Sequence, residues 1–161
     1  MFASQCYHSR MRFLRWIQGV ALALLLTATG CSSFNREWRQ AAKQPHPAND
    51  ITGRWEGRWI SEVSGHNNKL QALVNPVDAG HYDVKFHAAY KKWITVHFGY
   101  TVRMEARPTG SGVAFHGSED LGTLAGGIYT YDGHADATNL FSTYKSKYDS
   151  GQFEMERPKT E

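Results

Sequence analysis

The sequence predicts an all-β protein, an eight-stranded antiparallel up-and-down β-barrel that occupies residues 51–158. Two features of this segment support the prediction. Apolar and polar residues alternate with a period of two, which is typical of strands with one buried face and one wet face. Turn residues interrupt the alternation at short intervals and leave no stretch long enough for a helix. Short connections between consecutive strands favour the up-and-down barrel over a sandwich.

The first half of this segment holds the four longest alternating runs. In the first run, Trp55 and Trp59 share one phase, whereas the other phase begins with three charged residues. Pro76 ends the second run and Pro108 ends the fourth, since proline and the glycines that follow are typical of turns. The expected strands cover residues 53–62, 69–75, 81–91 and 94–107.

Four shorter strands follow, separated by turns such as Asp132-Gly133 and the segment 148–151. The seventh strand is the least regular. Its aromatic residues Phe141 and Tyr144 are three positions apart, so they need a β-bulge to share a face. The expected strands cover residues 113–117, 129–131, 140–146 and 153–157.

The predicted inward phase carries many aromatic residues. One interpretation is that these side chains simply fill an eight-stranded barrel, whose width side chains can just occupy. The other is that they line a cavity in which tyrosine hydroxyls orient a ligand. The predicted ligand-binding residues of the barrel interior are Trp55, Trp59, Tyr82, Phe86, Tyr90, Phe98, Tyr100, Phe115, Tyr129, Tyr131 and Phe153.

The last strand predicts how the barrel closes. Arg157 shares the inward phase of Phe153 and Met155, and closure would place it beside Trp55 of the first strand. A guanidinium stacked on an indole there would gain about 1–2 kcal/mol of cation–π attraction. With Gly53-Arg54-Trp55 at the start of the first strand, residues 51–158 resemble the calycins, the superfamily of lipocalins, fatty-acid-binding proteins and avidins. In lipocalin-like members an Arg of the last strand often packs against that Trp, so the resemblance implies the same barrel.

The first 30 residues read as a secretory signal. Arg12 and Arg15 precede an apolar run at 16–26, which is too short to span a membrane and ends in small residues. The segment Ala28-Thr29-Gly30-Cys31 resembles the lipobox of bacterial lipoproteins. This resemblance implies that residues 1–30 are removed and that the Cys31 thiol carries lipid. The alternative is a plain secretory signal followed by an incidental cysteine.

Residues 31–50 connect Cys31 to the barrel and are expected to form a flexible tether. Phe34, Trp38 and Ala41 recur at helical spacing, so a short helix is the alternative. Ser32 stands where an Asp would signal inner-membrane retention in the lipoprotein-sorting rule, so the resemblance implies an outer-membrane anchor facing the periplasm. Residues 159–161 form a tail.

Charge and cysteine content exclude several classes of protein. All 15 Asp and Glu follow residue 30, whereas three of the 18 Lys and Arg precede it, so the chain beyond the leader is neutral overall. A neutral domain lacks the basic surface that nucleic-acid binding requires. With Cys6 in the leader, Cys31 is left without a partner for a disulfide or a CxxC metal site.

The sequence carries none of the common catalytic or cofactor motifs, such as HExxH, GxSxG, the P-loop or GxGxxG. We therefore predict no enzyme and no cofactor. A turn at 91–93 would set His87 opposite His97, but two imidazoles on an open face make only a weak metal site. No metal is predicted. Further ionisable residues are expected on loops at one rim of the barrel, namely Glu119, Asp120, Asp132, His134 and Asp136.

These observations favour a lipid-anchored barrel of the cell envelope that binds a small apolar or aromatic ligand. The alternative is a non-catalytic structural or interaction lipoprotein whose barrel is packed solid. An interior with no void above about 300 Å³ would exclude the first function. The expected partners are membrane lipid, through acylated Cys31, and a small hydrophobic ligand.

Overall fold

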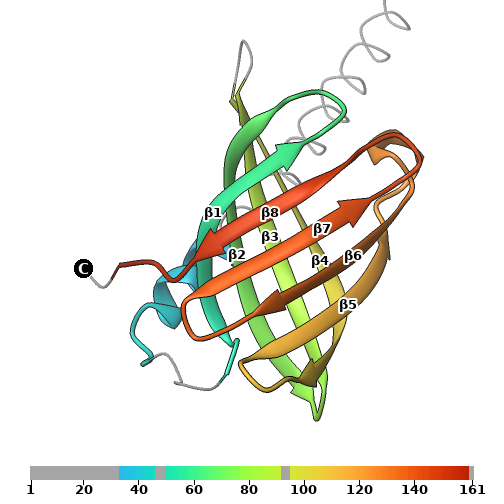
Figure 1. The fold of residues 1–161 in the computed structure, drawn as a ribbon. Coiled ribbons are helices and arrows are strands. Elements are labelled where there is room, and N and C mark those ends of the chain that lie inside the picture. The colour runs from blue at the N-terminus through green and yellow to red at the C-terminus, as the bar shows by residue number, and fades with distance from the viewer. Residues whose placement is uncertain (1–32, 46–49, 92–94, 160–161) are drawn as a thin grey trace, which may run out of the picture. The chain divides into compact units, whose positions relative to one another are not determined.

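In the computed structural model, the described residues are 33–45, 50–91 and 95–159. They form a closed antiparallel barrel whose strands follow one another in sequence order (Figure 1). Each strand pairs with the next, and β8 pairs with β1 to close the barrel. This arrangement confirms the predicted all-β, eight-stranded up-and-down barrel. The strands are β1 (Gly53–Ser61), β2 (Asn67–Asp78), β3 (His81–Lys91), β4 (Thr95–Pro108), β5 (Val113–Asp120), β6 (Ile128–Ala135), β7 (Asn139–Lys145) and β8 (Ser150–Glu156), and a short 3-10 helix, η1 (Thr123–Ala125), lies between β5 and β6.

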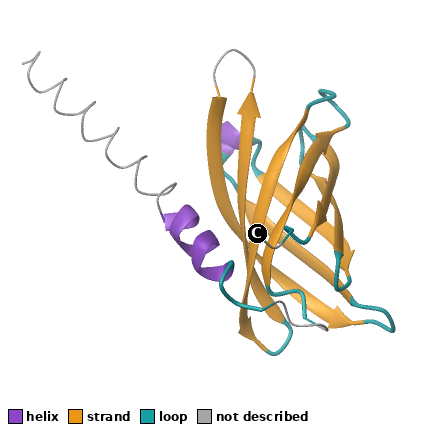
Figure 2. Ribbon diagram, turned by 90° about the vertical axis from the view of Figure 1, so that its left-hand side faces the viewer, coloured by secondary structure: helices purple, strands orange, loops and turns teal. Residues whose placement is uncertain are grey.

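The up-and-down topology gives the barrel two different ends, as the strands in Figure 2 show. At one end lie the beginning of β1, the end of β8 and the connections β2–β3, β4–β5 and β6–β7. We call this the tail end, because the barrel begins and finishes there. At the opposite end, the hairpin end, lie the connections β1–β2, β3–β4, β5–β6 and β7–β8.

The tail end is closed by a contact between the first and last strands. Trp55 is fully buried, and its indole N–H donates a hydrogen bond of 2.8 Å to the carbonyl oxygen of Ile51. The guanidinium of Arg157 lies 3.9 Å from the centre of the indole ring. It also donates to the carbonyl oxygens of Asp50 and Thr52, at 2.8 Å and 2.7 Å. The predicted contact between Arg157 and Trp55 is therefore present.

The interior next to this contact is packed solid. The side chains of Phe86, Met104 and Phe115 are buried there, and the space left between them and their neighbours amounts to only about 10 Å³. Such density is normal for a protein core. The residues around this remnant space are Ile51, Val74, Val84, Phe86, Met104, Phe115, Leu140 and Ser142.

Two local predictions on β6 and β7 are wrong. The expected turn at Asp132-Gly133 is part of β6, which continues to Ala135. Gly133 is needed inside the strand because the ring of Phe115 covers it: a Cβ at this position would lie 2.5 Å from Cζ of Phe115. Asp132 and Gly133 are residue types that are common in turns, but the chain does not turn here, and the glycine is explained by its packing against Phe115.

The bulge expected in β7 is also absent. Leu140, Ser142 and Tyr144 face inward in strict alternation, so Tyr144 is an inward residue. Phe141 lies on the other face, with its ring centre 5.7 Å from that of His134. The polar Ser142 fits inside because its hydroxyl donates to backbone carbonyl oxygens, one of them that of Asp132.

Part of the predicted tether is helical, in agreement with the alternative interpretation. Residues 33–41 form a helix, and the residues from Arg36 onward belong to the same compact unit as the barrel. Glu37 forms an ion pair of 2.6 Å with Lys85 of β3, and the guanidinium of Arg54 lies 5.3 Å from the ring centre of Trp38. The predicted signal, Cys31 and Ser32 lie outside the described residues. No helix of the described chain is both long and apolar enough to cross a membrane.

Candidate functional site

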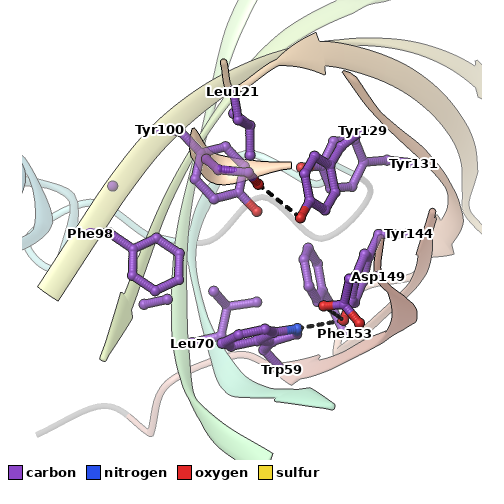
Figure 3. A pocket seen from close by; sticks show the side chains of 13 residues that line it. Trp59, Leu70, Phe98, Tyr100, Leu121, Tyr129, Tyr131, Tyr144, Asp149 and Phe153 are labelled. Carbon is purple, nitrogen blue, oxygen red and sulfur yellow. Dashed lines mark hydrogen bonds between the residues drawn. The ribbon is translucent and has the colours of Figure 1, made fainter. Parts of the chain in front are cut away.

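A pocket of about 420 Å³ occupies the hairpin half of the barrel. This volume lies within the range of sites that hold small ligands, which is about 300–1,000 Å³. Phe98 on its wall is 40 % exposed, so the pocket reaches solvent. As Figure 3 shows, the wall is mostly aromatic; the lining residues are Trp59, Leu70, Ala88, Phe98, Gly99, Tyr100, Leu121, Ala125, Tyr129, Tyr131, Tyr144, Asp149 and Phe153.

The structure divides the predicted interior residues between the two halves of the barrel. Those that line the pocket are Trp59, Phe98, Tyr100, Tyr129, Tyr131 and Phe153. Trp55, Phe86 and Phe115 instead belong to the packed core. Tyr82 lines an open groove at the tail end, and the side chain of Tyr90 lies outside the described residues. The two interpretations therefore apply to different parts of the barrel, because these residues differ in their position along the barrel axis.

The aromatic rings of the wall pack against one another. Phe153 lies at the centre of one group, with its ring centre 5.1 Å from that of Tyr144 and 6.0 Å from that of Tyr131. Trp59 meets Phe98 edge to face, with ring centres 6.0 Å apart. Because each ring is held by its neighbours, the wall is preorganised and presents flat faces at little entropic cost to a ligand.

A chain of hydrogen bonds fixes the one acidic residue of the pocket. The indole N–H of Trp59 donates to the Tyr144 hydroxyl at 2.7 Å (Figure 3), and that hydroxyl donates to Oδ2 of Asp149 at 2.9 Å. On its other side, Oδ1 of Asp149 accepts a hydrogen bond of 2.7 Å from the hydroxyl of Ser61. Asp149 therefore links the β7–β8 turn to the end of β1 and is held in one orientation.

Burial keeps the pocket tyrosines in their neutral form. It is the largest cause that raises the pKa of Tyr100, Tyr131 and Tyr144 above the ordinary value of 10.0. The negative charge of Asp149 raises the pKa of Tyr144 further. At neutral pH these three residues are uncharged hydrogen-bonding groups.

The tyrosine hydroxyls differ in how they are used. That of Tyr129 donates to the carbonyl oxygen of Ala125 at 3.0 Å. The hydroxyl of Tyr131 is buried beside that of Tyr100, and a side-chain hydrogen bond between the two affects the pKa of both residues. Tyr100 and Tyr131 therefore place a pair of neutral hydroxyls on the pocket wall.

The prediction did not include two lining residues that carry polar groups, Tyr144 and Asp149. Strict alternation from Leu140 through Ser142 would have placed Tyr144 inside, but the bulge expected from the spacing of Phe141 and Tyr144 left its direction open. Nothing in the sequence marked Asp149, because an acid in a turn is normally solvated. Its place in the pocket depends on how two separate turns meet.

The histidine pair differs from its prediction in register. Because strand pairing continues to Lys91 and Thr95, His97 pairs with Ala89, and His87 pairs with Gly99. The two imidazoles still stack diagonally, with ring centres 5.3 Å apart. Burial, and then the neighbouring His97, lower the pKa of His87, so the neutral form of His87 is favoured.

The expected rim of ionisable loop residues is not formed. Glu119 and Asp120 lie at the hairpin end, whereas Asp136 lies at the tail end, because β6 runs the length of the barrel between them. Asp132 lies within β6 and pairs with His116 at 2.8 Å. Among the described residues, no group of three or more His, Cys, Asp or Glu side chains is placed to hold a metal ion.

The chemistry of the pocket suits binding. It offers aromatic faces, tyrosine hydroxyls and one carboxylate, and the described residues that line it include no His, Cys, Lys or Arg. No family model, curated protein or solved structure matches the chain. Function is therefore proposed from the geometry of the site and from the features of the sequence.

Proposed function

We propose that this protein is a lipid-anchored β-barrel of the cell envelope that binds a small apolar or aromatic ligand in the pocket of its hairpin half. The observation that carries the proposal is the contrast between the two halves. The space among the packed core residues around Phe86 and Met104 is only about 10 Å³, whereas the pocket of the hairpin half has about 420 Å³ between aromatic walls. The tail end also carries an open groove of about 680 Å³, but its lining is largely made of loop residues and is not aromatic apart from Tyr82. A barrel that served only as a scaffold would gain stability by filling both halves, since empty space in a core costs free energy.

The shape and the polarity of the pocket describe its ligand in general terms. The volume accommodates a molecule of one or two small rings, and the flat faces of Trp59 and Phe153 favour a planar or apolar body. The hydroxyls of Tyr100 and Tyr131 supply polar contacts that would fix its orientation. This combination of an apolar wall and a few polar groups is typical of sites for small molecules.

The lipid anchor is the second part of the proposal, and it rests on the sequence. Ala28-Thr29-Gly30-Cys31 follows a charged and apolar leader, as expected of a bacterial lipoprotein. Several acyl chains would hold the protein on a membrane permanently, at about 0.8 kcal/mol for each buried CH₂ group. The stack of Arg157 on Trp55 supports a calycin-like origin of the barrel as a further part of this proposal.

Native mass spectrometry of the full mature protein, purified from cell extract, tests the ligand proposal. We expect a retained small molecule in the wild type. Ala88→Phe should remove it, because Ala88 is a buried residue of the pocket wall and a phenyl ring there would occupy the space. Ala114→Phe is the matched control, since Ala114 is exposed on β5. An empty wild-type protein, or equal retention by Ala88→Phe, would contradict the proposal.

One observation favours a second candidate function, that of an interaction lipoprotein. Val63, Ile128 and Tyr148 are more than 60 % exposed, and all three lie at or beside connections of the hairpin end. Exposed apolar side chains gathered at one end of a protein are typical of surfaces that contact another protein or a membrane. An empty pocket in the mass spectrum would favour this second function.

A further inference from the structure

We propose that the ligand is an organic cation, an amine or quaternary ammonium group on a small apolar or aromatic body. This inference rests on the proposed function, because it names the class of ligand that the hairpin-half pocket takes. Two features of the described residues of the pocket carry it: a carboxylate that forms no ion pair among them, and aromatic faces around the same space.

The charge of the pocket wall has one sign. Among the described residues that line the pocket, Asp149 is the only acidic one and none is basic. Among the ion pairs of the described residues, none includes Asp149, so no side chain there neutralises it. An entering cation is attracted to this carboxylate and an anion is repelled, and the interaction is stronger than in water because the apolar walls lower the effective dielectric constant.

The position of the carboxylate is fixed before any ligand arrives. Its two oxygens accept hydrogen bonds from Ser61 and Tyr144, and the backbone N–H of Asp149 donates to the Ser146 hydroxyl at 3.0 Å. An ionised carboxylate has about four lone-pair sites, so these two bonds leave acceptor capacity for a ligand. Asp149 is thus both oriented and available.

Tyr144 contributes its ring and not its hydroxyl. The hydroxyl donates its proton to Asp149 and accepts the indole N–H of Trp59, so it has no proton left to offer a ligand. Its ring stands beside that of Phe153, and both line the pocket with Trp59. The faces of such rings are electron-rich and attract cations, and this attraction is stronger at desolvated sites than at exposed ones.

A group of tyrosine hydroxyls lies on the other side of the pocket. Figure 3 shows Tyr100, Tyr129 and Tyr131 grouped together, apart from Trp59, Tyr144 and Asp149. The hydroxyls of Tyr100 and Tyr131 lie within hydrogen-bonding reach of one another. A cation held by Asp149 would therefore extend toward Tyr131, where a second polar group of the ligand could complete the contact.

A titration of the full mature protein, followed by amide-resolved NMR, tests the inference with three probes of similar size. Phenyltrimethylammonium is the cation, tert-butylbenzene is the neutral molecule of the same shape, and benzenesulfonate is the anion. We expect the cation to bind at least about tenfold more tightly than its neutral counterpart, and the anion to leave the pocket resonances unchanged. This comparison uses the wild-type protein and needs no variant.

Two matched variants locate the effect. Asp149→Asn removes the charge but keeps an acceptor for Ser61 or Tyr144, so the preference for the cation should fall to about one, while the neutral probe still binds. Asp132→Asn removes the same charge from the outer face of β6 and should leave the preference unchanged. Tyr131→Phe should leave the preference for charge intact, because it removes only the second polar contact.

The outcomes separate this inference from the proposed function. If the neutral probe binds as tightly as the cation, the pocket holds apolar ligands without selecting charge, and the cation inference fails while the proposed function stands. A preference that survives Asp149→Asn would also overturn the inference. If no probe shifts the pocket resonances, the cation inference fails. The proposed function is then tested separately, by whether native mass spectrometry detects a small molecule that remains bound to the wild-type protein.

Discussion

Two small sets of side chains, at opposite ends of the barrel, have different consequences for the protein. At the tail end, the contact between Arg157 and Trp55 joins the last strand to the first. All three nitrogens of the Arg157 guanidinium donate hydrogen bonds to backbone carbonyl oxygens. At the hairpin end, Asp149 and Tyr144 shape a pocket. The first set contributes chiefly to stability, and the second contributes chiefly to binding.

Replacing Trp55 tests the first set. We expect Trp55→Ala to lower the free energy of unfolding by about 3–5 kcal/mol, because it leaves a cavity in the packed half and removes the surface on which Arg157 stacks. Urea denaturation measures the loss. Trp59→Ala is the comparison: its indole borders space that is already empty, so a smaller loss is expected. A loss below about 1 kcal/mol for Trp55→Ala would show that this indole does not support the core.

The buried tyrosines predict how stability responds to alkaline pH. Burial raises the pKa of Tyr100 and Tyr131 in the folded state, so above pH 10.0, the ordinary pKa, the unfolded chain loses protons that the folded barrel keeps. Stability should therefore be constant below this pH and should fall as the pH rises through and beyond it. Urea denaturation at neutral pH and near pH 11 measures the fall. In Tyr131→Phe the fall should be shallower, whereas the exposed Tyr148→Phe should behave as the wild type.

At the level of strands, glycines decide how closely neighbouring chains approach. Gly57 of β1 pairs with Met155 of β8 at the seam that closes the barrel. A Cβ at position 57 would overlap the carbonyl oxygen of Glu154 and approach the Cα of Met155 to 2.7 Å. Because backbone atoms cannot move aside without breaking the strand pairing, the seam requires a residue without a side chain at this point.

A pair of glycine substitutions tests this requirement. Gly57→Ala should lower the free energy of unfolding by about 2 kcal/mol or more, because it forces β1 and β8 apart. Gly110→Ala, in the β4–β5 connection, should have an effect within about 1 kcal/mol of zero, since nothing lies within 4 Å of a Cβ there. Thermal and urea unfolding of both variants measure the difference. Equal stabilities would mean that the seam tolerates a side chain.

For the whole molecule, the barrel is filled in one half and hollow in the other. The packed half and the continuous ring of strands supply the stability, which allows the hollow half to remain unfilled. Functional sites of proteins are commonly less well packed, and therefore less stable, than the rest of the structure.

The proposed anchor has a direct test. In cells that express the protein, metabolic labelling with an alkyne-tagged palmitate should modify the wild type, and the protein should remain in the membrane fraction after a high-salt wash. Cys31→Ser should abolish both results, because it removes the thiol that is proposed to receive lipid. Cys6→Ser is the matched control and should preserve both, since the proposal has the leader cut off together with Cys6. Labelling that persists in Cys31→Ser would contradict the lipoprotein assignment.

Most strands could be predicted because alternation is a local property of extended chain. The phase of Trp55, Phe86 and Tyr131 follows directly from their neighbours, and the structure buries all three. Two predictions, the turn at Asp132-Gly133 and the bulge in β7, are wrong because they rely on residue type and spacing alone. Gly133 is a residue type common in turns, but here it makes room for the ring of Phe115. Phe141 and Tyr144 are expected to share a face through a bulge, but they lie on opposite faces of a regular strand.

The sequence by itself determined the number of strands, their order and the face on which most side chains lie, because each depends on residues that are close together along the chain. Only the tertiary structure decided which inward side chains fill the barrel and which surround the pocket, since that depends on strand register and on position along the barrel axis. It also brought Asp149 to Ser61 and Tyr144. That contact joins two turns distant in sequence, so no local pattern records it.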